Sequence, residues 1–182
     1  INIDGLNFFG TTFKTHNSTN ITVDNCNLKY PSYSKRMLYD LTPMDVTSLK
    51  MRKWDEKANN TVRNCKFEYM DGPALEMNGW NNLVENNYMH NIDYSCTYAG
   101  GWTLNMVNAP ELVFRRNTIH TTGASEMFKA GIRNLIELND ISRTGFLQND
   151  GALIQISVKQ QDRSETRYNW VHDSVTIGLR FD

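Results

Sequence analysis

The chain has 182 residues, which is enough for one domain of ordinary size with a sizeable core. Its 19 basic and 20 acidic side chains leave a net charge of −1, which gives no reason to expect a nucleic-acid or anionic-membrane partner. No apolar run approaches the roughly 18 residues of a membrane span. The sequence starts at Ile1 in mid-pattern and stops at "GLRFD", where a strand still runs. We therefore interpret it as a piece of a longer protein.

Asparagine is the unusual feature of the composition, with 22 of the 182 residues, whereas proline supplies only four. Asn tolerates left-handed backbone and bonds its own main chain, so this excess predicts frequent turns. Three glycosylation sequons begin at Asn17, Asn20 and Asn59 and matter only in a secreting eukaryote. The three cysteines show no CxxC spacing, and therefore no sign of a zinc knuckle or redox motif.

One segment repeats along the whole chain, and each copy has an anchor residue followed two places later by an apolar residue. In chain order the anchors are Leu6, Cys26, Cys65, Asn87, Asn117, Asn139 and Asn169. They lie 20, 39, 22, 30, 22 and 30 residues apart. Their apolar partners are Phe8, Leu28, Phe67, Met89, Ile119, Ile141 and Val171. Short alternating apolar runs such as "NITVD" and "NLIEL" precede the anchors, and the constant phase indicates a structural repeat.

Units of this length, made of short strands between Asn and Gly turns, resemble the coils of a right-handed parallel β-helix. Coils stack at about 4.8 Å, so equivalent residues form ladders. We predict an all-β, single-stranded parallel β-helix solenoid of about seven coils over residues 1–182. The six anchors from Cys26 to Asn169 form one turn column, in which Cys26 and Cys65 are buried free thiols, and the apolar partners from Leu28 to Val171 point inward. Each coil has a second strand about ten residues past its anchor, and loops bulge out at residues 30–59 and 91–101.

Three carboxylates fall near this second strand on successive coils. Glu126, Asp150 and Asp182 lie 9, 11 and 13 residues after their anchors, which predicts an acidic column on one face. Neighbouring carboxylates repel, so one stays protonated beside one ionised base or nucleophile. Glycoside hydrolysis needs such a pair, about 5 Å apart for retention or about 6.5–9.5 Å for inversion. The structural alternatives are a turn role for Asp150 and a surface ion pair with Arg180 for Asp182.

Other side chains are expected to bind the substrate. Lys129, Gln155 and Arg180 are expected to flank the carboxylates, with Trp102 as a stacking wall for a sugar ring. The histidines His90, His120 and His172 each lie three places after an anchor, but Ser142 interrupts their ladder, so they predict no metal site. We consider a sugar-contacting or proton-relay role for His120 and His172; the alternative is a polar ladder that satisfies the turns.

With its coils laid out, the chain resembles the right-handed β-helix carbohydrate-active enzymes, the pectate lyase and polygalacturonase superfold. The resemblance rests on the repeat, on segments such as "RRNTIH", and on "NDGA" and "GLRFD". The polygalacturonase signatures (Asn-Thr-Asp, paired Asp, Gly-His-Gly and Arg-Ile-Lys) are absent from the sequence. The chain is most similar to β-helix glycoside hydrolases in which two carboxylates on adjacent coils act together. The resemblance implies Asp150 and Asp182 as that pair, with Glu126 as the substitute.

The function expected on these grounds is a secreted or cell-surface glycoside hydrolase that cleaves a polysaccharide without a cofactor. Two alternatives remain open. One is a polysaccharide lyase built on Lys129 and Arg180 with Ca²⁺, although no dense Asp/Glu cage is evident. The other is a non-catalytic β-helix that serves in adhesion, glycan binding or surface structure.

Overall fold

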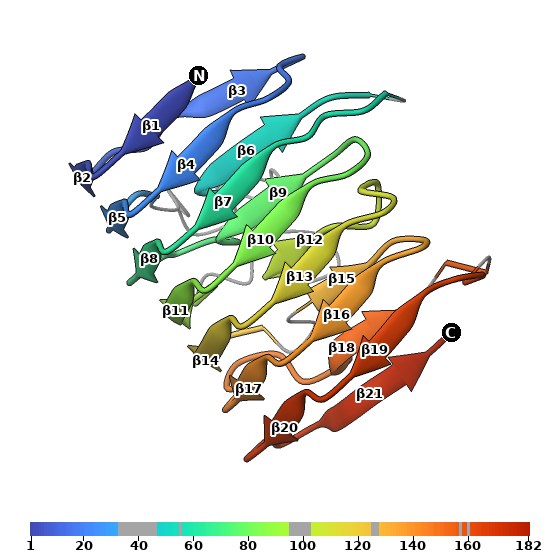
Figure 1. The fold of residues 1–182 in the computed structure, drawn as a ribbon. Coiled ribbons are helices and arrows are strands. Elements are labelled where there is room, and N and C mark those ends of the chain that lie inside the picture. Colours follow the sequence, from blue (N-terminus) through green and yellow to red (C-terminus); the bar gives the residue numbers. More distant parts are fainter. Residues whose placement is uncertain (33–46, 55, 95–102, 125–127, 157, 160) are drawn as a thin grey trace, which may run out of the picture.

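A computed structural model describes residues 1–32, 47–54, 56–94, 103–124, 128–156, 158–159 and 161–182. These residues form 21 strands in three parallel sheets of seven strands each, and every coil gives one strand to each sheet (Figure 1). The first sheet contains β1 (Asn2–Asp4), β4 (Thr22–Asp24), β7 (Thr61–Arg63), β10 (Leu83–Glu85), β13 (Val113–Arg115), β16 (Leu135–Glu137) and β19 (Glu165–Arg167). The expected parallel β-helix of seven coils is confirmed.

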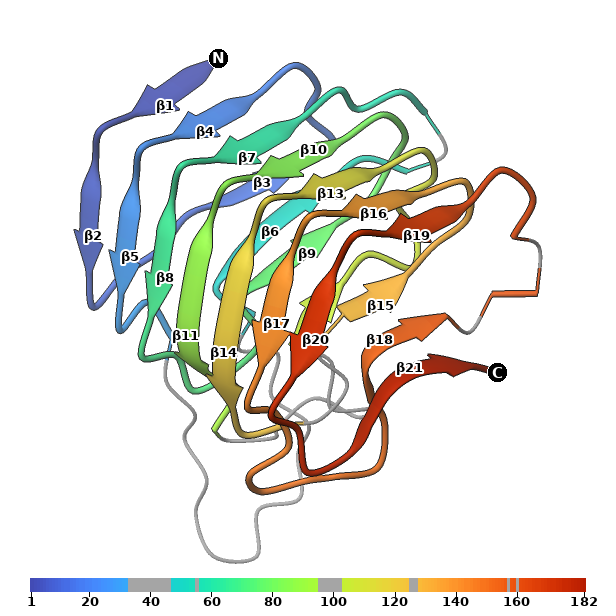
Figure 2. The ribbon, with the colours of Figure 1, turned by 60° about the horizontal axis from the view of Figure 1, so that its bottom comes forward.

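The other two sheets complete each coil, as the view in Figure 2 shows. The second sheet contains β2 (Asn7–Phe9), β5 (Asn27–Lys29), β8 (Lys66–Glu68), β11 (Tyr88–Ile92), β14 (Thr118–Thr122), β17 (Asp140–Ser142) and β20 (Trp170–His172). The third contains β3 (Lys14–His16), β6 (Leu49–Arg52), β9 (Leu75–Met77), β12 (Leu104–Asn105), β15 (Phe128–Ala130), β18 (Ala152–Ile156) and β21 (Ile177–Phe181). We number the coils one to seven from β1–β3 to β19–β21.

The inward ladder of the second sheet has the expected register. Each residue pairs with the next one in the order Phe8, Leu28, Phe67, Met89, Ile119, Ile141 and Val171. The five from Leu28 to Ile141 expose none of their surface, and Phe8 and Val171 pack against the same core. Burial of each large side chain contributes roughly 1.5–3 kcal/mol, so this ladder is a main source of the stability of the solenoid.

A single left-handed residue makes each corner between the first and second sheets. It immediately precedes each anchor and has a φ of 51–67° in Gly5, Asn25, Asn64, Asn86, Arg116, Leu138 and Tyr168. From Cys65 on, the anchor side chain then points inward and bonds the backbone of the preceding coil. The amide oxygen of Asn117 accepts the backbone N–H of Asn87 at 3.0 Å, and Asn139 and Asn169 continue the series at 2.9 and 3.1 Å. The predicted turn column is confirmed.

Cys26 and Cys65 occupy the same column as buried free thiols, as expected. The Cys26 backbone N–H lies 3.4 Å from the Cys65 Sγ, so the thiol takes the place of the amide oxygen. Burial raises the pKa of the Cys65 thiol to about 12, which makes it unreactive at neutral pH.

Two expectations about strands were wrong. Each coil has three strands rather than two, because the segment after each anchor is itself a strand: "RYNWVHDS" starts at a corner and continues into β20. The loop expected at 30–59 contains β6, which supplies the third-sheet strand of coil two. The expected loop at 91–101 begins inside β11, and its residues 95–101 lie outside the described ones.

Among the residues that the structure describes, no helix is long and apolar enough to cross a membrane.

Candidate functional site

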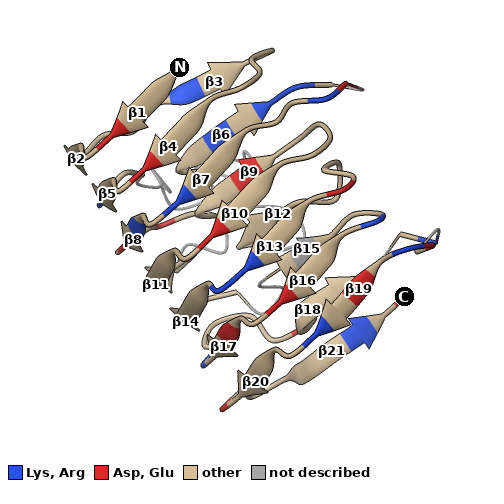
Figure 3. Cartoon of the chain, in the orientation of Figure 1, with Lys and Arg blue, Asp and Glu red and all other residues tan. Residues whose placement is uncertain are grey.

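A polar row crosses the outer face of the third sheet, where side chains alternate with the buried core residues of the same strands. The register places one member in each coil: Lys14, Lys50, Glu76, Asn105, Lys129, Gln155 and Arg180. Figure 3 shows the charged members on β3, β6, β9 and β21. The predicted neighbours Lys129, Gln155 and Arg180 therefore share one row. The side chain of Lys129 lies outside the described ones.

The row is buried in its middle although it points away from the core. Lys50, Glu76 and Gln155 expose 3%, 6% and 4% of their surface. Glu76 holds two cations: its Oε1 accepts Arg52 Nε at 2.8 Å and its Oε2 lies 3.6 Å from Lys50 Nζ. Burial lowers the pKa of Lys50, and the carboxylate of Glu76 opposes that effect. Buried charge is costly unless it is paired, so this part of the row is an organised polar site.

The two carboxylates of the expected catalytic pair meet at Arg180. Arg180 Nε donates to Asp182 Oδ1 at 2.6 Å, and its Nη1 lies 3.5 Å from Asp150 Oδ1. Gln155 Nε2 donates to the other oxygen of Asp182 at 2.7 Å. Because both carboxylates contact one guanidinium group, these oxygens lie less than about 9 Å apart.

The prediction of an acidic column was wrong for Asp150 and Asp182, which lie at opposite ends of their strands. Asp182 follows β21 and donates its backbone N–H to Ile156, whereas Asp150 precedes β18 by two residues, in the turn before Gly151. The connection from the second to the third sheet varies in length, so an equal count from the anchors does not give equal positions. Asp150 exposes 91% of its side chain, so the desolvation expected for a proton donor is absent in the unliganded chain. Glu126 and Trp102 lie outside the described residues.

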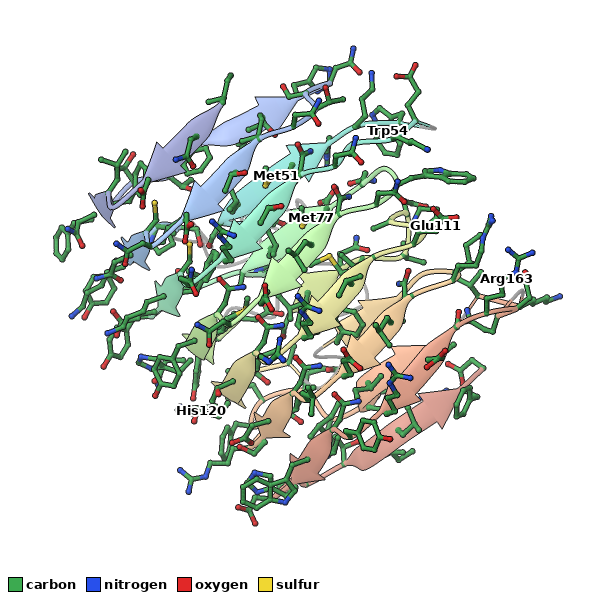
Figure 4. All side chains as sticks on the ribbon, viewed as in Figure 1. Met51, Trp54, Met77, Glu111, His120 and Arg163 are labelled. Atoms are coloured by element: carbon green, nitrogen blue, oxygen red, sulfur yellow. The ribbon has the colours of Figure 1, made fainter. Side chains whose placement is uncertain are left out.

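The histidines occupy a different face. His120 lies on β14 and His172 on β20, in one outward ladder of the second sheet with Glu68, His90 and Ser142. They are therefore not grouped with Asp150, Asp182 and Arg180, which lie at the third sheet. In Figure 4, His120 lies along the opposite edge of the solenoid from Trp54.

Side chains, rather than the turns, satisfy these histidines. His90 Nε2 pairs with Glu68 at 2.9 Å, Tyr88 Oη bonds His120 Nε2 at 2.8 Å, and His172 Nε2 pairs with Asp140 at 2.9 Å. His90 and His120 stack with ring centroids 5.5 Å apart.

The surroundings shift the pKa values of His120 and His172 in opposite directions. Burial, reinforced by the charge of His90, lowers the pKa of His120. The hydrogen bond to Asp140 raises the pKa of His172.

Sequence reasoning missed the buried Lys50–Glu76 pair and a third buried charge, Asp93. Asp93 is fully buried at the corner after β11, and burial raises its pKa to about 7 although Thr103 lies 3.5 Å from its Oδ2. Lys50 and Asp93 fell in segments expected to be loops, so no alternation pointed to them. No group of three or more His, Cys, Asp or Glu within the described part of the chain could hold a metal ion.

Comparison with known proteins places the geometry in context. A family model described as a right-handed beta helix region matches residues 53–181. The match covers coils three to seven almost entirely and includes β18 and β21, which carry Gln155 and Arg180. A search of curated proteins finds no match.

Proposed function

Because the chain belongs to the right-handed β-helix family, we propose that it is a carbohydrate-active enzyme, a glycoside hydrolase that cleaves a polysaccharide with Asp150 and Asp182. The observation that carries the proposal is the contact of one guanidinium group, that of Arg180, with both carboxylates across adjacent coils. Their separation, below about 9 Å, does not exceed the largest distance at which a pair of carboxylates flanks one glycosidic bond.

The contacts assign a different role to each carboxylate. Asp182 accepts from Arg180 and Gln155 through its two oxygens, and these donors hold the carboxylate in place. Asp182 is therefore the base that activates water, or the nucleophile that attacks the anomeric carbon. Asp150 has one longer contact and is otherwise open, so it is the carboxyl that gives its proton to the leaving glycosidic oxygen once a bound glycan excludes water.

We place the protein outside the cell, secreted or on the surface, because a polysaccharide substrate is found there. The sequon residues Asn17, Asn20 and Asn59 support this location, since all three are exposed and have left-handed backbone at φ 52°, 55° and 49°. Such turn positions leave the side-chain amide accessible to glycan attachment.

The test measures new reducing ends released from a panel of polysaccharides by the wild type and by single variants. Asp182→Asn and Asp150→Asn are each expected to reduce hydrolysis by orders of magnitude with the fold intact, because each removes one of two required groups. Asp4→Asn is the matched control, since this carboxylate is exposed at the end of β1, on the first sheet and at the other end of the solenoid.

Other outcomes contradict the proposal in distinguishable ways. Full activity in either Asp variant removes that residue from the mechanism and makes Glu126→Gln the next test. Ultraviolet absorbance from an unsaturated uronate product identifies a lyase. A panel without any product indicates the non-catalytic, glycan-binding or structural role.

A further inference from the structure

A cavity of about 380 Å³ lies along the corner between the third and first sheets. Two tryptophans, Trp54 after β6 and Trp80 after β9, line it together with Lys53 and Asn108. Aliphatic side chains from coils four to six complete its wall: Val107, Pro110, Ile132 and Val158. The lining thus comes from five successive coils, and at about 4.8 Å per coil the cavity extends for about 19 Å along the solenoid axis.

We propose that this cavity is a binding groove for an extended, electrically neutral glycan chain. The inference deepens the proposed function, on which it rests, by naming the substrate class and the path of the chain. Aromatic side chains with nearby amides are the usual means of holding a sugar, because its C–H face packs on the ring and its hydroxyls bind the polar groups.

The two tryptophans are held differently. The Arg133 guanidinium lies 5.1 Å from the centre of the Trp80 ring and 3.5 Å from Glu111, so Trp80 is fixed from one side. Gly79 has a φ of +89°, and a Cβ there would lie 2.8 Å from the Lys53 carbonyl oxygen. This glycine therefore permits the close packing that brings Trp80 beside Lys53. Trp54 is 51% exposed and serves as the accessible platform.

The charges around the groove favour a neutral ligand. Lys53 pairs with Glu56 at 2.8 Å, Arg133 with Glu111 at 3.5 Å, and Arg163 with Asp162 at 3.9 Å. In Figure 4, Trp54, Glu111 and Arg163 lie along one edge of the solenoid. Because these three cations already have carboxylate partners, a uronate would have to displace an acidic side chain from each cation that it contacts. A neutral sugar needs only the tryptophan faces and hydrogen bonds.

The groove leads to the carboxylate pair. Val158 lines its far end two residues after β18, and Asp182, which follows β21 in the next coil, donates its N–H to Ile156 at 3.0 Å. Asp182 therefore stands at the same corner, one coil beyond the groove. From Trp54 in coil two to Asp182 in coil seven the path crosses five coil spacings, about 24 Å. Only a chain of several sugars reaches from the platform to the cleavage site.

The experiment separates binding from cleavage. Affinity electrophoresis is run in gels that contain xylan, mannan or mixed-linkage β-glucan, with polygalacturonate as the acidic comparison. The wild type and Asp182→Asn are expected to be retarded by at least one neutral polymer and not by polygalacturonate. Trp54→Ala is expected to lose the retardation, Trp54→Phe to keep most of it, and the control Trp170→Ala, which alters an exposed ring on the second sheet, to keep all of it.

Kinetics on the same variants measure the path. For the retarding polymer, Trp54→Ala is expected to raise KM about tenfold with little change in kcat, since one stacking contact is lost. For a disaccharide or trisaccharide from that polymer, too short to reach coil two, the variant is expected to match the wild type.

Each outcome decides one question. Retardation without hydrolysis overturns the hydrolase and leaves the groove in place. Hydrolysis with an unchanged Trp54→Ala overturns the groove and leaves the hydrolase in place. Retardation by polygalacturonate alone overturns the neutral class, and a wild type that no polymer retards overturns the groove.

Discussion

The outer faces of the first and third sheets both bear charged residues, but they arrange them in opposite ways. On the first sheet the register alternates acid and base: Asp24, Arg63, Glu85, Arg115, Glu137 and Arg167 (Figure 3). The pairs bond at 2.7–2.9 Å near the surface. On the third sheet the row buries Lys50 and Glu76 and ends with two carboxylates on one arginine.

We interpret the difference as that between a ladder that stabilises the solenoid and one that serves the proposed function. Opposite charges on neighbouring strands stabilise a sheet modestly at little cost when they stay in water. Burial of charge costs several kcal/mol per ion, and apolar residues often stabilise the same positions better. The first sheet therefore shows what this solenoid does with charge for stability alone. The third sheet departs from that pattern, which is why we place the binding and cleavage of a ligand there.

The largest expected effect comes from breaking a pair on each sheet. Glu76→Ala deprives the buried Lys50 of its carboxylate and should cost about 3–5 kcal/mol of unfolding free energy. Glu85→Ala, which breaks the half-exposed contact with Arg115, should cost no more than about 1 kcal/mol. Urea unfolding followed by circular dichroism measures both. Equal losses would show that the two rows do not differ. Replacing both members, Lys50→Met with Glu76→Leu, should recover most of the loss.

Two aspartates should give pH dependences of opposite sign. The pKa of buried Asp93 is raised to about 7 from 3.8, so its contribution is present below pH 4 and is lost as the pH rises to 7, by about 4 kcal/mol. The hydrogen bond from Asn64 lowers the pKa of Asp24 on the first sheet, so its contribution is lost as the pH falls below 4. Curves of unfolding free energy against pH for Asp93→Asn and Asp24→Asn test both signs. A variant whose curve runs parallel to that of the wild type contradicts the sign expected for its aspartate.

Added salt should distinguish the exposed ion pairs of the first sheet from the buried pair of the third, with a smaller effect on stability. Ions screen exposed pairs within a few ångströms at about 1 M salt. Arg115→Ala should therefore cost about 0.5 kcal/mol in dilute buffer and almost nothing at about 1 M NaCl. The cost of Glu76→Ala should stay nearly constant, because Glu76 and its partner Lys50 are buried. A cost of Glu76→Ala that vanishes in salt would place that pair in solvent.

The smallest effect concerns the second sheet, which has neither the alternating acids and bases of the first sheet nor the buried charged pair of the third. NMR titration of the imidazole C–H protons should place the pKa of His120 below 6.5 and that of His172 above it. His172 then stabilises the fold at low pH, an effect lost as the pH rises through its folded pKa. The contribution of His120 to stability has the opposite sign, and it is lost as the pH falls. Asp140→Asn should return the His172 value toward 6.5, and an unchanged value would contradict the assigned cause.

The core and the turn column could be predicted from sequence because both depend on short, constant offsets. An anchor and an apolar residue two places later stay together in every coil, as Asn117 and Ile119 do. The strand after each anchor, in the second sheet, was not predicted because a single residue makes the corner before it. That residue is Arg116, Leu138 or Tyr168 as readily as Asn. No turn residue marks the boundary there.

The candidate site was only partly predictable, because it depends on connections of unequal length. Gln155, Arg180 and Asp182 follow from strand alternation, since they lie within or directly after β18 and β21. Asp150 reaches Arg180 from a turn at the other end of its strand, which no count from an anchor reveals. Trp54 and Trp80 lie 26 residues apart in the sequence, and their shared cavity depends on the stacking of coils two and three.

The asparagine column also makes the solenoid behave as a one-dimensional lattice, in which each coil is coupled to its nearest neighbours. Asn117 donates to the Val84 carbonyl and to Asn139, so its amide fastens coils on both sides, while a thiol accepts only weakly. Where Cys65 takes the place of the amide, this fastening is two weaker thiol contacts, one from the Cys26 N–H at 3.4 Å and one to the Val23 carbonyl at 3.7 Å. Along this column coils one to three are therefore the first to separate, because the thiols of Cys26 and Cys65 replace the amides there. Gain or loss of a whole coil elsewhere preserves every remaining link, so such a molecule changes length in steps of one coil.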